Sequence, residues 1–235
     1  MSKFRTLINL LIPSQCALCQ RGGWTLCETC LDQLELDSHL ANRADLRGYS
    51  ITKYAEPVSA LLSHFKERGV TEISDRLVSR FDSTALSKML EATDVPAWAQ
   101  VSSATANLLQ PTYLVPVPSS KASMRVRGFN PAEQVAKSLR AQLAGSADLR
   151  VARVLTRRLE VADQASLNLS SRWQNQTGSM AVRHSVAGMR CLLVDDIVTT
   201  GATLLEARKT LVEQGASVVG FFTLAETFLN RATQK

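Results

Sequence analysis

The stretch from Cys191 to Thr203 constrains the fold of this chain more than any other part of its 235 residues. It begins with Cys-Leu-Leu-Val, a continuous apolar run that is typical of a parallel strand buried on both faces. Asp195 and Asp196 follow directly, so both acids lie at the carboxyl end of that strand. Open α/β sheets bind ligands at this end, in the crevice outside the strands. The stretch therefore predicts an α/β fold with a ligand site at the two acids.

The residues that follow the two acids form a candidate anion site. They are small or carry hydroxyl groups, and they lead into a predicted helix: Thr199, Thr200, Gly201, Ala202 and Thr203. Free N–H groups and the dipole at a helix start favour an anion, and a glycine lets the backbone approach it closely. Because carboxylates repel phosphate, Asp195 and Asp196 should face ribose hydroxyls or a hydrated Mg²⁺ instead. The pattern predicts a sugar-phosphate site, and the alternative is an acidic turn before an ordinary capped helix.

The surrounding segments support the α/β class. Short apolar segments alternate with helical ones from Tyr113 onward, as in a sheet flanked by helices. Strands are predicted over residues 113–117, 151–156, 191–194 and 218–224, and helices over 58–68, from 73, over 131–143 and over 202–214. The Ala- and Ser-rich stretch 83–110 is also predicted to be helical. Gly215 stands where a glycine would end the last helix.

The positive charge of the chain is concentrated in one segment. The formal net charge is +6, and residues 116–160 alone carry nine basic residues against three acidic ones. A local excess of this kind indicates an anion-binding surface on an otherwise balanced protein. For Lys137 and Arg140, a solvated helix face is the favoured alternative.

Four of the five cysteines lie within fifteen residues and predict a small metal-binding module. They form two Cys-x2-Cys pairs: Cys16, Cys19, Cys27 and Cys30. Thiolates at this spacing chelate from tight turns, and two such turns supply the four ligands of a structural Zn²⁺ site. Disulfide bonds are the alternative, disfavoured because the chain shows no secretion signal. We expect a zinc-ribbon-like module over residues 1–36, with Met1–Pro13 as a packed helix.

Together these motifs resemble the ComF/GntX-like group of type I phosphoribosyltransferase homologues. Leu193–Thr203 matches the type I signature of an apolar strand, two acids and a threonine-rich loop. Other shared pieces follow the cysteine module in order: Tyr54, Phe65-Lys66, Gly69, Val115-Pro116-Val117-Pro118, Arg127-Gly128-Phe129-Asn130, Gln164, Arg172 and Asn175. Pro131 departs from the group, which usually has a glutamine there. The resemblance implies a type I phosphoribosyltransferase fold over residues 50–235, with a mainly parallel sheet, flanking helices and a mobile hood.

The resemblance also implies roles for residues outside the acidic motif. Pro118–Lys121 looks like a pyrophosphate loop with cationic support, and residues 157–178 look like the hood that closes over substrate. The side chains implicated in these two roles are Ser119, Ser120, Lys121, Arg125, Arg127, Arg157, Arg158, Gln164 and Arg172. Cations so placed would neutralise the charge on a departing pyrophosphate.

By this resemblance, the chain is expected to bind 5-phosphoribosyl diphosphate with Mg²⁺ and to transfer ribosyl 5-phosphate to an unidentified acceptor, releasing pyrophosphate. Asp195 and Asp196 would be the catalytic residues that hold the ribose and the metal. The alternative is a non-catalytic or regulatory sugar-phosphate-binding protein that acts in DNA uptake (competence) or recombination and binds single-stranded DNA. No stretch approaches the roughly 20 apolar residues of a membrane span, so a cytoplasmic protein without membrane insertion is expected.

Overall fold

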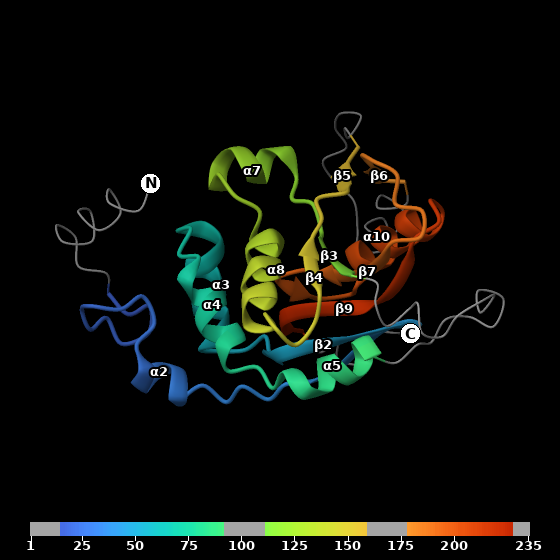
Figure 1. Ribbon diagram of the computed structural model, residues 1–235. Coiled ribbons are helices and arrows are strands. Elements are labelled where there is room, and N and C mark those ends of the chain that lie inside the picture. Colours follow the sequence, from blue (N-terminus) through green and yellow to red (C-terminus); the bar gives the residue numbers. More distant parts are fainter. Residues whose placement is uncertain (1–14, 92–110, 159–177, 228–235) are drawn as a thin grey trace, which may run out of the picture.

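The computed structural model describes residues 15–91, 111–158 and 178–227 (Figure 1). Its main feature is a seven-stranded sheet with the order β1-β2-β9-β7-β3-β4, in which β8 also pairs with β9. The strands are β1 (His39–Arg43), β2 (Leu46–Lys53), β3 (Thr112–Pro116), β4 (Leu149–Val151), β7 (Arg190–Val194), β8 (Ile197–Val198) and β9 (Ser217–Glu226). Every pairing in this sheet is parallel except that of β1 with β2. The mainly parallel α/β fold predicted from the sequence is therefore confirmed.

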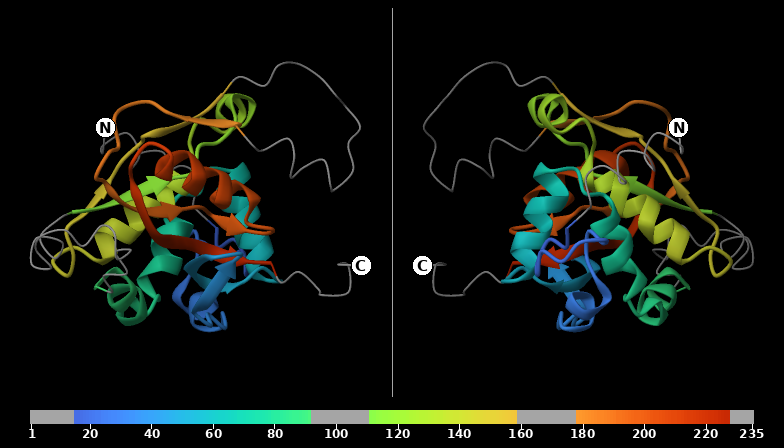
Figure 2. Two further views of the ribbon diagram at one scale, coloured as in Figure 1. Left: turned by 90° about the vertical axis from the view of Figure 1, so that its right-hand side faces the viewer. Right: turned by 90° about the vertical axis from the view of Figure 1, so that its left-hand side faces the viewer.

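Helices cover both faces of the sheet (Figures 1 and 2). One apolar core lies between the sheet and α3, α4, α5 and α8, and the other between the sheet and α10 with the β5–β6 ribbon. The bounds are α2 (Glu28–Asp32), α3 (Val58–Glu67), α4 (Glu72–Ser79), α5 (Ser83–Glu91), α7 (Lys121–Arg127), α8 (Pro131–Gln142), α10 (Ala202–Val212), β5 (Leu155–Arg157) and β6 (Met180–Val182). Phe221 and Phe222 on β9 enter the two cores alternately, because successive side chains of a strand point to opposite faces.

The central strands and helices lie close to where the sequence predicts them. Gly215 adopts the left-handed conformation expected after α10, with φ of +82°. The prediction of one strand over residues 151–156 was wrong. β4 ends at Val151 beside β3 in the main sheet, whereas β5 begins at Leu155 and pairs with β6, so the chain leaves the sheet between them.

The elements that were not predicted include a hairpin and a short helix. The antiparallel β1–β2 hairpin extends one edge of the sheet, and α7 follows β3 where a turn was expected. In the side views, α7 stands apart from the sheet and its helices (Figure 2). α5 covers only the start of the predicted 83–110 helix, and residues 92–110 and Met1–Pro13 lie outside the described residues.

The cysteine module packs on the rest of the described chain. Cys16, Leu26 and Leu31 belong to the same apolar core as Ile73 and Leu77 of α4. The expected boundary at residue 50 falls inside β2, which pairs with β9. Within the described residues, we find no helix of the length and apolarity that crossing a membrane requires.

Candidate functional site

An open pocket of about 330 Å³ lies at the carboxyl ends of β3 and β7. Four helices contribute to it: the last turn of α3, one side of α7, and the starts of α8 and α10. Its lining residues are Lys66, Val117, Pro118, Ser119, Ser120, Ser123, Arg127, Asn130, Pro131, Ala132, Arg157, Asp195, Asp196 and Thr203. The pocket therefore lies where a mainly parallel α/β sheet binds ligands.

The structure brings together about half of the residues singled out in the sequence. Those that line the pocket are Asp195, Asp196, Thr203, Ser119, Ser120, Arg127 and Arg157. Thr199, Thr200, Gly201 and Ala202 form the adjoining loop, and Lys121, Arg125 and Arg158 are exposed outside the pocket lining. Gln164, Arg172 and Asn175 lie outside the described residues, within the segment that joins β5 to β6.

The two acids sit at the end of β7, whose last four residues are buried. The Asp196 N–H donates to Asp195 Oδ1 at 2.9 Å, and the Ile197 N–H donates to Asp196 Oδ1 at 2.7 Å. Lys66 on α3 places its Nζ 2.9 Å from Asp196 Oδ2. Burial and, second to it, the charge of Asp196 raise the pKa of Asp195 well above its ordinary value. The acid pair is thus held in place, although its surroundings make the ionised form of Asp195 less favourable.

Replacing Asp195 with asparagine is expected to stabilise the ligand-free protein at neutral pH. The folded state holds the Asp195 proton more tightly than the unfolded chain does. The contribution of the Asp195 carboxyl to stability is therefore complete below its unfolded pKa and is lost as pH rises through its folded pKa. Asparagine does not ionise, so Asp195→Asn should raise the Tm by a few degrees at pH 8 and by less at pH 4. Thermal unfolding of both proteins across this range checks the prediction, and a gain that grows on acidification would contradict it.

Another part of the pocket wall carries hydroxyls and cations: it is the loop after β3, together with neighbouring residues of α7 and β5. Asn130, the N-cap of α8, accepts from Ser119 Oγ at 3.1 Å, and its Nδ2 donates to the Val117 carbonyl at 2.9 Å. Arg157 on β5 donates from Nε to the Pro118 carbonyl at 3.0 Å. The loop is therefore fixed from both sides, and Arg127 adds a second guanidinium to the lining. Such a wall suits a polyanion.

Arg43 holds the threonine-rich loop through a hydrogen bond to its backbone. Its side chain is buried, and its Nε donates to the Thr199 carbonyl at 2.6 Å. Gly201, with φ of +80°, passes so close that a Cβ there would lie 2.5 Å from Arg43 Cγ. Glu226 pairs with the Arg43 guanidinium, and His39 contacts the second carboxylate oxygen of Glu226 at 2.8 Å. The backbone path of the loop thus depends on a residue of β1.

Lys66, Asn130 and Arg43 are the site residues that sequence reasoning did not assign. The first two occurred in motifs shared with the resembled group, but nothing in their local pattern indicated a role. Lys66 stands in the last turn of an amphipathic helix, where a lysine commonly complements the helix dipole. Arg43 belongs to the hairpin that the sequence did not reveal.

The four-cysteine cluster forms a candidate metal centre. The Sγ atoms of Cys16, Cys19, Cys27 and Cys30 all lie within 4.8 Å of one another. Tetrahedral Zn²⁺ with Zn–S bonds of about 2.3 Å separates its sulfurs by about 3.8 Å. Cys19 and Cys27 already stand 3.7 Å apart, and the Cys27 N–H points at Cys16 Sγ at 3.5 Å. The cluster therefore fits one closed, structural zinc ion.

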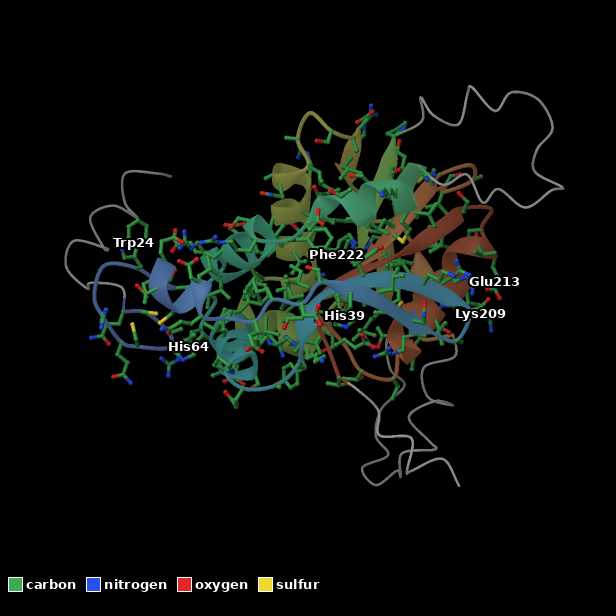
Figure 3. The ribbon with its side chains drawn as sticks, turned by 90° about the horizontal axis from the view of Figure 1, so that it is seen from below. Trp24, His39, His64, Lys209, Glu213 and Phe222 are labelled. Atoms are coloured by element: carbon green, nitrogen blue, oxygen red, sulfur yellow. The ribbon has the colours of Figure 1, made fainter. Side chains whose placement is uncertain are left out.

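The cysteine module is attached to α4 by polar contacts. Thr25 Oγ1 donates to Glu72 at 2.8 Å, and Arg76 pairs with Glu28 at 2.7 Å. Trp24 does not pack against the cluster: it is 63% exposed, with the Arg76 guanidinium 6.0 Å from its ring centroid. Figure 3 shows it at the end of the molecule opposite to Lys209 and Glu213 of α10.

Comparison with known proteins bears on the pocket. A family profile described as "Phosphoribosyl transferase domain" matches residues 124–234. The chain is 26% identical over 242 residues to the DNA utilization protein YhgH of Escherichia coli K12, covering 93% of this chain and 99% of that protein. It is 31% identical over 176 residues to the competence protein ComFC of Bacillus subtilis, covering 74% of this chain and 62% of ComFC.

A solved structure of adenine phosphoribosyltransferase from Leishmania donovani aligns with 87% of this chain and 86% of its own length, at 13% identity and a TM-score of 0.35. The profile match includes the acid pair and the threonine-rich loop, and the match to YhgH extends over almost the whole chain. The chain therefore carries a phosphoribosyl transferase domain and is a homologue of ComFC and YhgH, as its sequence motifs predicted.

Proposed function

We propose that the pocket binds 5-phosphoribosyl diphosphate with Mg²⁺ and that the protein transfers ribosyl 5-phosphate to an acceptor, releasing pyrophosphate. The observation that carries this proposal is the arrangement of opposite chemistries around one pocket. Asp195 and Asp196 line it directly after β7, while Ser119, Arg127 and Arg157 line it from the loop after β3, from α7 and from β5. A ligand that fits must carry hydroxyls or a cation for the acids and a polyanion for the cations.

The start of α10 supports the 5-phosphate end of such a ligand. Thr203 lines the pocket in the first turn of this helix, and Gly201 precedes it in a left-handed conformation. Free N–H groups of a first turn, the helix dipole and a threonine hydroxyl together favour phosphate. The ribose would then lie over the acid pair, with its diphosphate toward Ser119 and Arg127.

The proposed reaction breaks the bond between ribose C1 and a diphosphate oxygen and forms one between C1 and the acceptor. Pyrophosphate leaves with the bonding electron pair, and the acceptor's proton passes to solvent. Mg²⁺, when bound, supplies positive charge for the diphosphate oxygens. Asp195 and Asp196 orient the ribose hydroxyls, and Arg127 and Arg157 stabilise the leaving group. Among the described residues of the pocket, no side chain stands out as a general base that would take the acceptor's proton.

Thermal unfolding with ligand tests the proposal. Millimolar 5-phosphoribosyl diphosphate with Mg²⁺ should raise the Tm of the wild type by several degrees, since a ligand at 100 times its Kd adds about 2.7 kcal/mol. The same addition should leave the Asp195→Asn/Asp196→Asn variant within about a degree of its own ligand-free Tm. Glu213→Gln, on the far end of α10, is the matched control and should respond like the wild type. An unresponsive wild type would refute the proposal.

The names of the homologues favour a second candidate, a role in DNA uptake or utilization with single-stranded DNA as partner. YhgH is named for DNA utilization and ComFC for competence. Lys121 and Arg125 are exposed on α7, beside the pocket, where a phosphate backbone could reach them. DNA binding should weaken steeply with salt, whereas the sugar-phosphate site should require Mg²⁺. Binding assays at two salt concentrations separate the two candidates.

A further inference from the structure

Lys66 is a cation placed among groups that would face the metal or the sugar. It reaches the pocket from α3, more than 120 positions before the acid pair in sequence, and contacts Asp196 Oδ2 at 2.9 Å. The other oxygen of that carboxylate accepts from the Ile197 N–H at 2.7 Å. The side chains of Lys66 and Asp196 are 25% and 11% exposed, so the pair is largely withdrawn from water. Lys66 thus holds the carboxylate oxygen that the backbone leaves free.

This contact is at odds with simultaneous ligand binding by the same oxygen. A divalent cation at Asp196 Oδ2 would lie beside the positive charge of the Lys66 ammonium, and the two cations would repel each other. An ammonium is a compact charge on a flexible four-carbon stem, and it can change partners without a change in the backbone. Ser119 and Arg127 line the same pocket, so Lys66 shares it with the wall that suits a polyanion.

We propose that Lys66 is an exchangeable counter-ion. It neutralises Asp196 while the pocket holds no ligand, and it gives up Asp196 Oδ2 to a divalent cation and pairs with phosphate oxygens when the ligand binds. The inference rests on the proposed function of the pocket and adds a binding residue to it. Lys66 then opposes cation binding in the empty pocket and favours polyanion binding, so its removal shifts the two affinities in opposite directions.

Two titrations on the full chain test this, with Mn²⁺ alone and with inorganic pyrophosphate in EDTA as probes. Lys66→Gln should bind Mn²⁺, followed by electron paramagnetic resonance, about tenfold more tightly than the wild type, the effect of removing one partly buried competing charge. It should bind pyrophosphate, followed by calorimetry, about tenfold more weakly. Lys66→Arg keeps the charge and should stay near the wild type in both titrations. Lys137→Gln, which breaks the Lys137–Glu133 pair outside the pocket, is the matched control and should change neither.

A merely structural Lys66 would weaken both affinities together through loss of fold, which circular dichroism and Tm would register. Unchanged or weaker Mn²⁺ binding by a folded Lys66→Gln overturns the proposal, and so does undetectable Mn²⁺ binding in both proteins. Opposite shifts in the two titrations support it. This test can be distinguished from the test of the proposed function, because neither Mn²⁺ nor pyrophosphate is 5-phosphoribosyl diphosphate. If 5-phosphoribosyl diphosphate failed to bind the wild type, the comparison of Lys66→Gln with the wild type could still be made.

Discussion

Replacing Gly201 with alanine is expected to abolish ligand-induced stabilisation and to lower the stability of the protein by several kcal/mol. The φ of Gly201 is +80°, and a side chain costs roughly 1–2 kcal/mol in the left-handed region. The new Cβ would also lie 2.5 Å from Arg43 Cγ and 2.6 Å from Arg43 Cβ. Overpacking of this kind adds roughly 1–3 kcal/mol. The loop must therefore move, and Thr203 moves with it.

Arg43 cannot retreat from an added side chain without breaking other contacts. Its guanidinium is buried, donates to the carbonyls of Thr199 at 2.6 Å and Thr227 at 3.2 Å, and pairs with Glu226. Shifting it would separate the buried Glu226 carboxylate from the guanidinium that it pairs with, and breaking a buried ion pair is strongly destabilising. The displacement therefore falls on the loop, and the loss of phosphate binding follows from the same contact as the loss of stability.

Gly188 provides a matched control for this prediction. Its φ of +76° is almost the same, but a Cβ there would meet nothing within 4 Å. Gly188→Ala should therefore show only the left-handed cost of roughly 1–2 kcal/mol and retain the Tm response to 5-phosphoribosyl diphosphate. Denaturant unfolding and ligand-dependent Tm measurements on both variants make the comparison. Equal losses in the two variants would show that the approach of Gly201 to Arg43 is unimportant.

How much of this site the sequence could predict depends on whether its parts are contiguous. The acid pair and the threonine-rich loop follow one strand without interruption, so local pattern alone placed them at a ligand-binding edge. Lys66, Asn130 and Arg43 come from three other segments, and only the strand order brings them to the same place. A single sequence carries no signal for such long-range proximity, except as pieces of a shared motif.

The cations predicted beside the pyrophosphate loop illustrate a second limit. The resemblance implies a loop over Pro118–Lys121 with Arg125 and Arg127 as its cationic support, whereas the structure forms α7 over Lys121–Arg127. On a helix only residues three and four apart share a face. Ser120, Ser123 and Arg127 follow this spacing and line the pocket, while Lys121 and Arg125 fall on the exposed side. Recognising the serine N-cap and the glycine after Arg127 as helix ends would have separated the two groups.

Replacing Cys30 with serine is expected to remove the zinc ion and to unfold the cysteine module. Cys30 is buried, and burial together with the neighbouring thiols raises its pKa to about 12. Backbone N–H groups of Cys19 and Cys27 outweigh the effect of burial on Cys16 and lower its pKa to about 6. Zinc binds thiolates, so binding at neutral pH must release protons from this cluster, Cys30 foremost. Serine supplies no thiolate, and three sulfurs do not close the site.

The loss of structure in Cys30→Ser should spread beyond the cysteine module, because Cys16, Leu26 and Leu31 share an apolar core with α4. We expect the metal content measured by mass spectrometry to fall from one zinc per chain to none, with a loss of several kcal/mol of stability. In the wild type, acidification should release the ion, since protons compete for the thiolates. Cys191→Ala removes a buried thiol outside the cluster and should keep its zinc. A Cys30→Ser protein that retains stoichiometric zinc would show that the four sulfurs do not form the centre.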